Sequence, residues 1–106
     1  MNIYVDIDET ICVSPEDRNY ANATPIPERI DMINKLYDEG NRIVYWTARG
    51  TVSGIDWVRV TMNQFKEWGV KYHQVKFNKP AYDLFIDDKN INSESFFSNS
   101  DIIFLK

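Results

Sequence analysis

The sequence has little cysteine or histidine and no long apolar run, and each shortage excludes a class of protein. Its one cysteine, Cys12, cannot form a disulfide within the chain and agrees with a reducing cytoplasm. Its one histidine, His73, lacks the companions that a histidine-based metal site needs, so we expect a structural or surface role. No apolar run approaches the roughly 20 residues of a membrane-spanning helix. The first residues also lack the basic and apolar segments of a signal peptide, so we expect a cytoplasmic protein.

Positive charge is also scarce relative to negative charge. Twelve Lys and Arg residues face 16 Asp and Glu residues, which gives a net charge of −4. This acidic balance disfavours association with nucleic acid or with an anionic membrane, so we expect neither partner. A small phosphorylated molecule is a compatible partner, provided that local cations face it.

The length and composition indicate a single globular domain over residues 1–106. A chain of 106 residues can build one hydrophobic core but not a second one. Hydrophobic residues make up 43% of the chain and charged residues 26%, a balance typical of a soluble globular domain rather than of a disordered segment.

Apolar runs and helix-periodic segments alternate along the chain. Five short apolar runs predict buried strands, over residues 3–7, 43–46, 75–77, 84–86 and 102–105. Apolar residues recur at helical spacing between Pro27 and Gly40 and again between Trp57 and Gly69, and residues 93–97 predict one helical turn. Strands that alternate with helices favour a parallel α/β sheet with right-handed crossovers.

A polar excursion over residues 12–27 separates the first expected strand from the first expected helix. It contains Pro15 and Pro25 and is longer than an ordinary connection of this kind. Long loops at the carboxyl edge of a sheet often cover a functional site, and the alternative is a surface loop without a role. Arg18, inside this excursion, is expected to be a solvated charge more often than a substrate ligand.

Polar residues recur where the expected strands end. Asp6 and Asp8 close the first run, and as alternate residues of a strand they point to the same side. The later runs are each followed by a hydroxyl, a cation or a carboxylate, namely Thr47 and Arg49, then Lys79, then Asp87 and Asp88. In a parallel sheet these ends share one edge, so we expect the side chains to converge on one crevice.

Such a crevice suits phosphoryl chemistry. Carboxylates packed together repel one another, and a hard divalent cation such as Mg²⁺ offsets that repulsion while leaving room for substrate phosphate. Lys79 could neutralise phosphoryl oxygens and Thr47 could donate to one of them, which leaves Asp6 free to attack phosphorus. Taken singly, the aspartates also suit turns, Thr47 suits a cap and Lys79 suits a solvated surface. Their joint order along the chain favours the catalytic interpretation.

That joint order resembles the haloacid dehalogenase (HAD) superfamily of aspartate-nucleophile phosphohydrolases. The matching motifs are Asp-x-Asp-x-Thr over residues 6–10, then Thr47, Lys79 and the Asp87-Asp88 pair. The wider context, with Trp-Thr-Ala-Arg-Gly at 46–50 and Asn-Lys-Pro at 78–80, is similar to a small capless branch often labelled capsular polysaccharide biosynthesis phosphatase. The resemblance implies an HAD-like, Rossmann-like three-layer α/β/α sandwich with a mainly parallel five-stranded sheet and no separate cap domain.

The resemblance also implies a role for each matching residue. Asp6 would be the nucleophile, and Asp8 would protonate the leaving oxygen and then activate water. Thr47 and Lys79 would hold the phosphoryl group and complete the catalytic set. The substrate-binding residues would be Thr47, Ala48, Arg49 and Lys79. The cofactor Mg²⁺ would be bound by a side-chain oxygen of Asp6, the backbone carbonyl of Asp8 and Asp87, with Asp88 bound directly or through water. Arg49 has a second interpretation, as the ion-pair partner of a carboxylate.

Glu9 lies inside the first motif and Cys12 lies just after it. Glu9 departs from the family pattern, which commonly has glycine there, so the position either takes an ordinary backbone conformation or accepts modest strain. No catalytic group is lost by this change. Cys12 lies just beyond, and we expect a packed thiol rather than a reactive one.

These features predict a Mg²⁺-dependent phosphomonoester hydrolase that works through an aspartyl-phosphate on Asp6. By resemblance, the substrate is expected to be a phosphosugar or a similar phosphorylated metabolite of capsule or surface polysaccharide biosynthesis. An open, capless pocket admits bulky substrates or is covered by a second copy in a homo-oligomer. Within enzymes the alternative is a nucleic-acid 3′-phosphatase, which the acidic balance disfavours. Outside enzymes the alternatives are a phospho-acceptor signalling module and a phosphosugar-binding domain.

Overall fold

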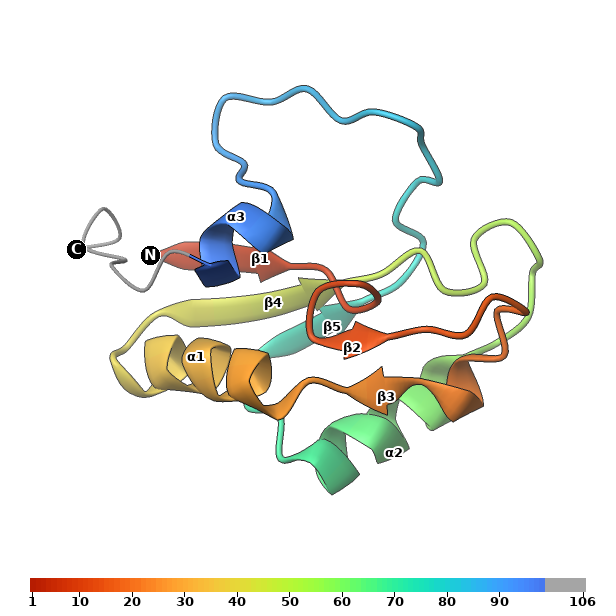
Figure 1. Cartoon of the computed structure of the whole chain (residues 1–106), viewed down its shortest axis with the longest axis horizontal. Helices are drawn as coiled ribbons and strands as arrows, with labels where there is room; N and C mark the ends of the chain where they lie inside the picture. The colour runs from red at the N-terminus through yellow and green to blue at the C-terminus, as the bar shows by residue number, and fades with distance from the viewer. Residues whose placement is uncertain (99–106) are drawn as a thin grey trace.

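A parallel sheet of three strands forms the centre of the fold in the computed structural model, which describes residues 1–98 (Figure 1). The strand order is β1 (Asn2–Val5), β4 (Arg42–Trp46) and β5 (Gln74–Lys76). In this register Val5 lies opposite Tyr45, and Tyr45 lies opposite Val75. The carboxyl ends of all three strands therefore meet at one edge, as the sequence pattern predicted.

The helices begin and end close to the residues that the sequence marks. Helix α1 (Pro27–Asp38) has Pro27 in its first turn, and helix α2 (Val58–Trp68) ends at Gly69 in the left-handed conformation, with φ 71°. A glycine suits that conformation because it has no Cβ to collide with the backbone. Helix α3 (Ser93–Ser98) confirms the helical turn expected near the end of the described chain. Within residues 1–98, no helix has the length and apolar content required to cross a membrane.

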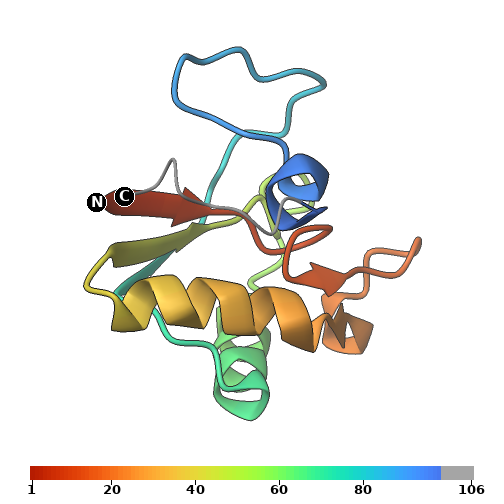
Figure 2. The ribbon, with the colours of Figure 1, turned by 60° about the vertical axis from the view of Figure 1, so that its left-hand side comes forward.

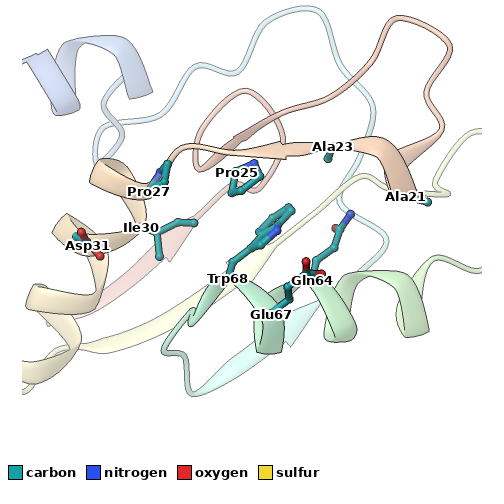
Figure 3. A pocket seen from close by; sticks show the side chains of 9 residues that line it. All are labelled: Ala21, Ala23, Pro25, Pro27, Ile30, Asp31, Gln64, Glu67 and Trp68. Atoms are coloured by element: carbon teal, nitrogen blue, oxygen red, sulfur yellow. The ribbon is translucent and has the colours of Figure 1, made fainter.

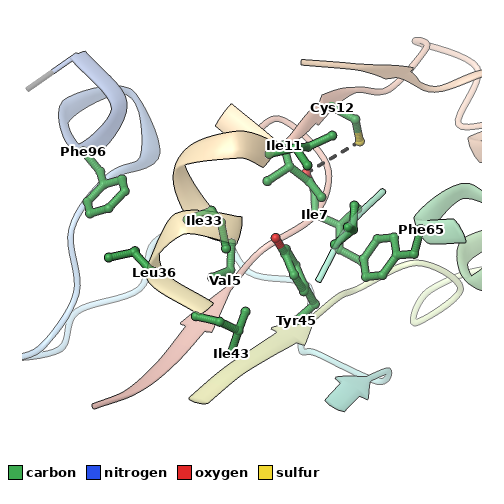
Figure 4. Packing of buried hydrophobic residues seen from close by; sticks show 12 residues of the cluster. Val5, Ile7, Ile11, Cys12, Ile33, Leu36, Ile43, Tyr45, Phe65 and Phe96 are labelled. Carbon is green, nitrogen blue, oxygen red and sulfur yellow. Dashed lines mark hydrogen bonds between the residues drawn. The ribbon is translucent and has the colours of Figure 1, made fainter. Parts of the chain in front are cut away.

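One hydrophobic core packs the helices against the sheet (Figure 4). Every layer contributes to it, with Val5, Ile43 and Tyr45 from the strands, Ile33 from α1, Phe65 from α2 and Phe96 from α3. The Tyr45 ring meets Phe65 edge to face, with centroids 4.9 Å apart. Each such side chain contributes about 1.5–3 kcal/mol when fully buried. This packing fixes where β1 and β4 end and therefore where the residues that follow them lie.

The polar excursion of residues 12–27 is ordered by a small hairpin. Strands β2 (Cys12–Val13) and β3 (Thr24–Pro25) pair in antiparallel fashion, and a short 3-10 helix, η1 (Tyr20–Asn22), lies between them. Tyr20 fastens this segment to α2, because its carbonyl accepts a hydrogen bond from Gln64 Nε2 at 2.6 Å. Its ring also meets Trp57 edge to face at 5.2 Å. The excursion is thus an ordered segment beside the carboxyl edge of the sheet.

The predicted five-stranded sheet was wrong in strand number for the described residues. Residues 84–86 form no strand, and Leu84 and Ile86 are 74% and 87% exposed. They belong to the segment that arcs away from the sheet between β5 and α3 (Figure 1, Figure 2). An apolar triplet is too short to define a strand without a pairing partner, and this one pairs with no strand in the described structure. The fifth predicted strand, residues 102–105, lies outside the described residues.

Candidate active site

Asp6 is the first residue after β1, and it lies beside a lysine. Its Oδ1 accepts a hydrogen bond from the backbone N–H of Ile7 at 2.8 Å, and its Oδ2 lies 3.7 Å from Lys79 Nζ. Burial raises the pKa of Asp6, and the Asp8 charge raises it further, whereas Lys79 and the Ile7 N–H act in the opposite direction. The structure therefore gives Asp6 a cationic neighbour and leaves its side chain 43% exposed to an incoming molecule.

The backbone after Asp6 makes a tight turn that accepts strain. Glu9 has φ 61°, in the left-handed region where a side chain is disfavoured by about 1–2 kcal/mol. The turn is closed by hydrogen bonds from Glu9 N to Cys12 O at 2.8 Å and from Ile11 N to Ile7 O at 2.9 Å. The Glu9 carboxylate accepts a hydrogen bond from Ser14 N at 3.0 Å. Of the two possibilities left open by the sequence, position 9 therefore takes the strained one.

Asp8 is clamped by a buried arginine. Arg49 Nε and Nη2 donate to the two oxygens of Asp8 at 2.9 and 2.8 Å, while Nη1 donates to Thr61 Oγ1 and Gln64 Oε1 at 3.0 and 2.7 Å. A weaker contact joins Nη2 to Cys12 Sγ at 3.8 Å. These contacts engage all five N–H groups that a guanidinium carries. Arg49 is only 3% exposed, so this structure favours its role as a carboxylate partner. Its predicted contact with substrate would require one of these hydrogen bonds to break.

Thr47 and Lys79 are held together by backbone pairing at the ends of β4 and β5. Thr47 N donates to Lys76 O at 2.9 Å, and Lys79 N donates to Thr47 O at 3.0 Å. Thr51 Oγ1 then donates to Lys79 O at 2.8 Å. The Thr47 hydroxyl accepts from Arg49 N at 3.1 Å, which leaves its own O–H as a donor. The order of the strands thus brings a hydroxyl and an ammonium to the end of β1.

One cavity of about 270 Å³ gathers most of these residues. Its lining residues come from the ends of β1 and β4 and from the excursion, namely Asp6, Asp8, Glu9, Arg18, Tyr20, Thr47, Ala48 and Arg49. Five of the residues predicted from the sequence therefore share one cavity, and Lys79 joins them through its ion pair with Asp6. Tyr20 was missed as a site residue, and Arg18, which is exposed as the predicted solvated charge, also lines the cavity. Their placement depends on how the excursion folds back, and the length of that excursion was the available signal.

Asp87 and Asp88 do not join this cavity in the described structure. They lie in the exposed arc, where Asp87 Oδ1 accepts from Asp88 N at 2.8 Å and Asp87 O accepts from Asn90 Nδ2 at 2.7 Å. These are turn contacts of the kind that aspartate often makes. Within residues 1–98, no three His, Cys, Asp or Glu side chains come together as a metal site. The carboxylates at the cavity in this arrangement therefore do not fit the predicted Mg²⁺ ligand set.

Cys12 and Tyr20 border the clamp formed by Arg49. Cys12 is fully buried, and its Sγ lies 3.6 Å from Ile7 O and 3.4 Å from Asp8 Oδ1 (Figure 4). Its burial confirms the predicted packed thiol, and burial and the Asp8 charge raise the pKa of this thiol. The centroid of the Tyr20 ring lies 4.9 Å from the Arg49 guanidinium carbon, so the ring packs against the guanidinium.

A larger hollow of about 420 Å³ lies between the excursion, α1 and α2 (Figure 3). Trp68, Ile30 and the two prolines Pro25 and Pro27 supply apolar walls, and Asp31 and Glu67 supply carboxylates. The hollow is separate from Asp6, and the residues that line it include no lysine, arginine or histidine. Size alone would select this hollow, but the convergence of carboxylates, cations and a hydroxyl selects the smaller cavity.

Comparison with known proteins supports the fold and goes no further. No protein-family model matches the chain, and no curated protein matches it. A crystal structure of a structural target from Vibrio cholerae superposes on 94% of this chain and 90% of its own, with a TM-score of 0.81 and 22% identity. At that identity the likeness shows a shared compact α/β fold.

Proposed function

We propose that this protein hydrolyses phosphomonoesters through an aspartyl-phosphate intermediate on Asp6. One observation carries the proposal, which is that two carboxylates, each paired with a cation, line a single cavity together with a buried threonine. Asp6 lies 3.7 Å from Lys79, and Asp8 lies 2.8 Å from Arg49. This arrangement suits a reaction in which one carboxylate attacks and the other moves a proton.

The proposed reaction is two transfers of one phosphoryl group. A carboxylate oxygen of Asp6 forms a bond to phosphorus while the ester P–O bond breaks, and the leaving oxygen takes a proton from Asp8. Asp8 then takes a proton from water, whose oxygen attacks phosphorus as the acyl-phosphate bond breaks. Inorganic phosphate leaves and Asp6 is restored. Lys79 and the Thr47 hydroxyl stabilise negative charge on the phosphoryl oxygens in both steps.

Mg²⁺ is part of the proposal on the strength of the sequence motifs alone. When bound, the ion would neutralise charge between carboxylates and phosphate. Since Asp87 and Asp88 lie outside the cavity in this arrangement, no step above is assigned to the ion. The proposed substrate is a phosphorylated small molecule such as a phosphosugar, in a cytoplasmic protein with an HAD-like three-layer fold and no cap. A homo-oligomer that covers the open cavity also belongs to this proposal.

The clamp on Asp8 favours a second candidate, a phospho-acceptor module. Both oxygens of Asp8 accept hydrogen bonds from Arg49, and protonation of Asp8 would weaken this charge-assisted pair. Slow proton transfer by Asp8 would slow hydrolysis of the aspartyl-phosphate on Asp6. After treatment with acetyl phosphate, a phosphatase should lose the group from Asp6 within seconds, whereas a signalling module should keep it for many minutes.

The proposal is tested by phosphate release from p-nitrophenyl phosphate in the presence of Mg²⁺. Asp6→Asn removes the attacking oxygen charge at almost constant size, so we expect turnover to disappear. Asp31→Asn makes the same chemical change on the exposed face of α1 and should retain the wild-type rate. Wild-type activity in Asp6→Asn would sink the nucleophile assignment.

A further inference from the structure

Arg18 is the cation that the excursion contributes to the lining of the cavity. Its side chain lines the same cavity as Asp6 and Asp8, although eight or more residues separate it from either along the chain. Its backbone N–H donates to Pro15 O at 3.0 Å, which closes a turn just before η1. Tyr20, two residues later, is fastened to α2 through Gln64 at 2.6 Å. These two hydrogen bonds therefore hold the backbone around Arg18 in place.

The other charges around the cavity already have partners, and Arg18 does not. Asp6 pairs with Lys79, Asp8 pairs with Arg49, and the Glu9 carboxylate accepts from Ser14. Across residues 1–98, the Arg18 guanidinium makes no hydrogen bond or ion pair with protein. Its backbone has φ 61°, a conformation that suits asparagine or glycine better than arginine. Arg18 thus lines the cavity with a guanidinium whose five donors have no protein acceptor among the described residues.

The proposed reaction decides which part of the substrate would meet Arg18. Asp8 gives its proton to the leaving oxygen, so the leaving group has to lie beside Asp8. Asp8 and Arg18 line one cavity, and the donors of Arg49 are already engaged. Of the two arginines that line the cavity, Arg18 is therefore the one whose guanidinium has donors free for the leaving group.

We propose that Arg18 binds a second anionic group, a carboxylate or a second phosphate, on the leaving group of the substrate. A guanidinium pairs with either group through two parallel hydrogen bonds, which gives both affinity and orientation. The cavity of about 270 Å³ lies just below the usual range of ligand sites, which suits a small leaving group. The inference rests on the proposed function and names its substrate class, namely small phosphorylated acids and bisphosphates.

The test compares kcat/KM for matched pairs of phosphate esters. 3-Phosphoglycerate against glycerol phosphate, and 6-phosphogluconate against sorbitol 6-phosphate, add a carboxylate. Fructose 1,6-bisphosphate against fructose 6-phosphate adds a phosphate. We expect the wild type to prefer the doubly anionic member of at least one pair by about ten- to a hundredfold, the range of a charged hydrogen-bonded contact. The pair that shows the preference tells whether the second group is a carboxylate or a phosphate.

Variants then assign that preference to Arg18. Arg18→Gln should bring the ratio within the preferred pair close to one, and Arg18→Asn should do the same with a residue that suits the backbone there. Arg59→Gln removes an exposed arginine of α2 and should leave the ratio unchanged. No preference in the wild type, or a ratio that survives in both Arg18 variants, overturns the inference and leaves the phosphatase intact. No phosphate release from any ester overturns the proposed function and the inference with it.

Discussion

The Asp8–Arg49 pair shows how much a single buried charge determines at this site. Arg49 is 3% exposed, and its hydrogen bonds reach β2, α2 and the turn after β1. It therefore orients Asp8 and also ties together segments far apart in sequence. The sequence left two roles open for Arg49 because periodicity says where an arginine lies along an element and not which carboxylate it meets.

Removing Arg49 should be costly for stability. Arg49→Met leaves Asp8 largely buried without its partner, so we expect the free energy of unfolding to fall by about 3–5 kcal/mol in urea titration. Lys71→Met removes a cation from the exposed pair with Asp38, whose side chains are 47% and 56% exposed, and should change stability by about 0.5 kcal/mol or less. Equal losses in the two variants would contradict a structural role for the buried clamp.

The ionisation of Asp6 gives a prediction that does not need turnover. Burial holds the pKa of Asp6 above the usual value of about 4, and Lys79 lowers it. Lys79→Met should therefore raise the pKa of Asp6 further in a ¹³C NMR titration of its carboxyl carbon, while Lys71→Met should leave it in place. Because only the ionised form attacks, activity should fall as pH drops through this raised pKa. A pKa of Asp6 that is not raised above its usual value in the wild type would contradict the effect assigned to burial.

Among the helices and strands, the sequence correctly predicted the features that depend on local residue preferences. The αL glycine after α2 and the proline in the first turn of α1 are local signals, and both helices begin and end where they indicate. Residues 84–86 were mistaken for a strand because an apolar triplet looks the same in a strand and in an exposed segment. Arg18 is exposed, as expected of a solvated charge, but its place at the cavity was not predicted because no local pattern encodes where the excursion packs.

The connection between β4 and α2 contains a glycine that no other residue can replace without movement. Gly50 has φ 82°, and a Cβ there would collide with the backbone oxygen of Ile55. This connection also contains Thr51, whose hydroxyl donates a hydrogen bond to the backbone carbonyl of Lys79. Gly50→Ala should therefore cost more than about 2 kcal/mol in urea titration and should weaken phosphate release.

Gly54 supplies the matched control within the same connection. It has φ 76°, but a Cβ there would meet open space. Gly54→Ala should cost only the backbone preference, about 1 kcal/mol. Equal losses of stability in the two variants would contradict the claim that Gly50 is required by the close approach of the Ile55 backbone oxygen.

At the scale of the whole molecule, an acidic chain gathers cations where a phosphate would bind. The net charge is −4, yet Arg18, Arg49 and Lys79 all lie at or beside one cavity. The same cavity holds Asp6, Asp8 and Glu9, so the local charges nearly balance before a substrate arrives. A dianionic phosphate would leave an excess of negative charge that a divalent cation could offset.

The Mg²⁺ requirement proposed from the sequence motifs predicts that hydrolysis of p-nitrophenyl phosphate stops when EDTA is added. Activity should return on addition of Mg²⁺ in excess over the chelator. The measurement is phosphate release before and after each addition, with the protein checked for unchanged folding by circular dichroism. A full rate in EDTA would remove the metal from the account and leave the role of Asp6 standing.

The central claim, that Asp6 carries the phosphoryl group, is tested most directly by trapping the intermediate. The Asp8→Asn variant should form the acyl-phosphate from p-nitrophenyl phosphate, which has a good leaving group, and should be slow to hydrolyse it. After an acid quench, peptide mass spectrometry should find a phosphoryl group on Asp6, and the Asp6→Asn, Asp8→Asn double variant should carry none. Phosphate release without any phosphoryl-Asp6, or a phosphoryl group on another residue, would contradict the account.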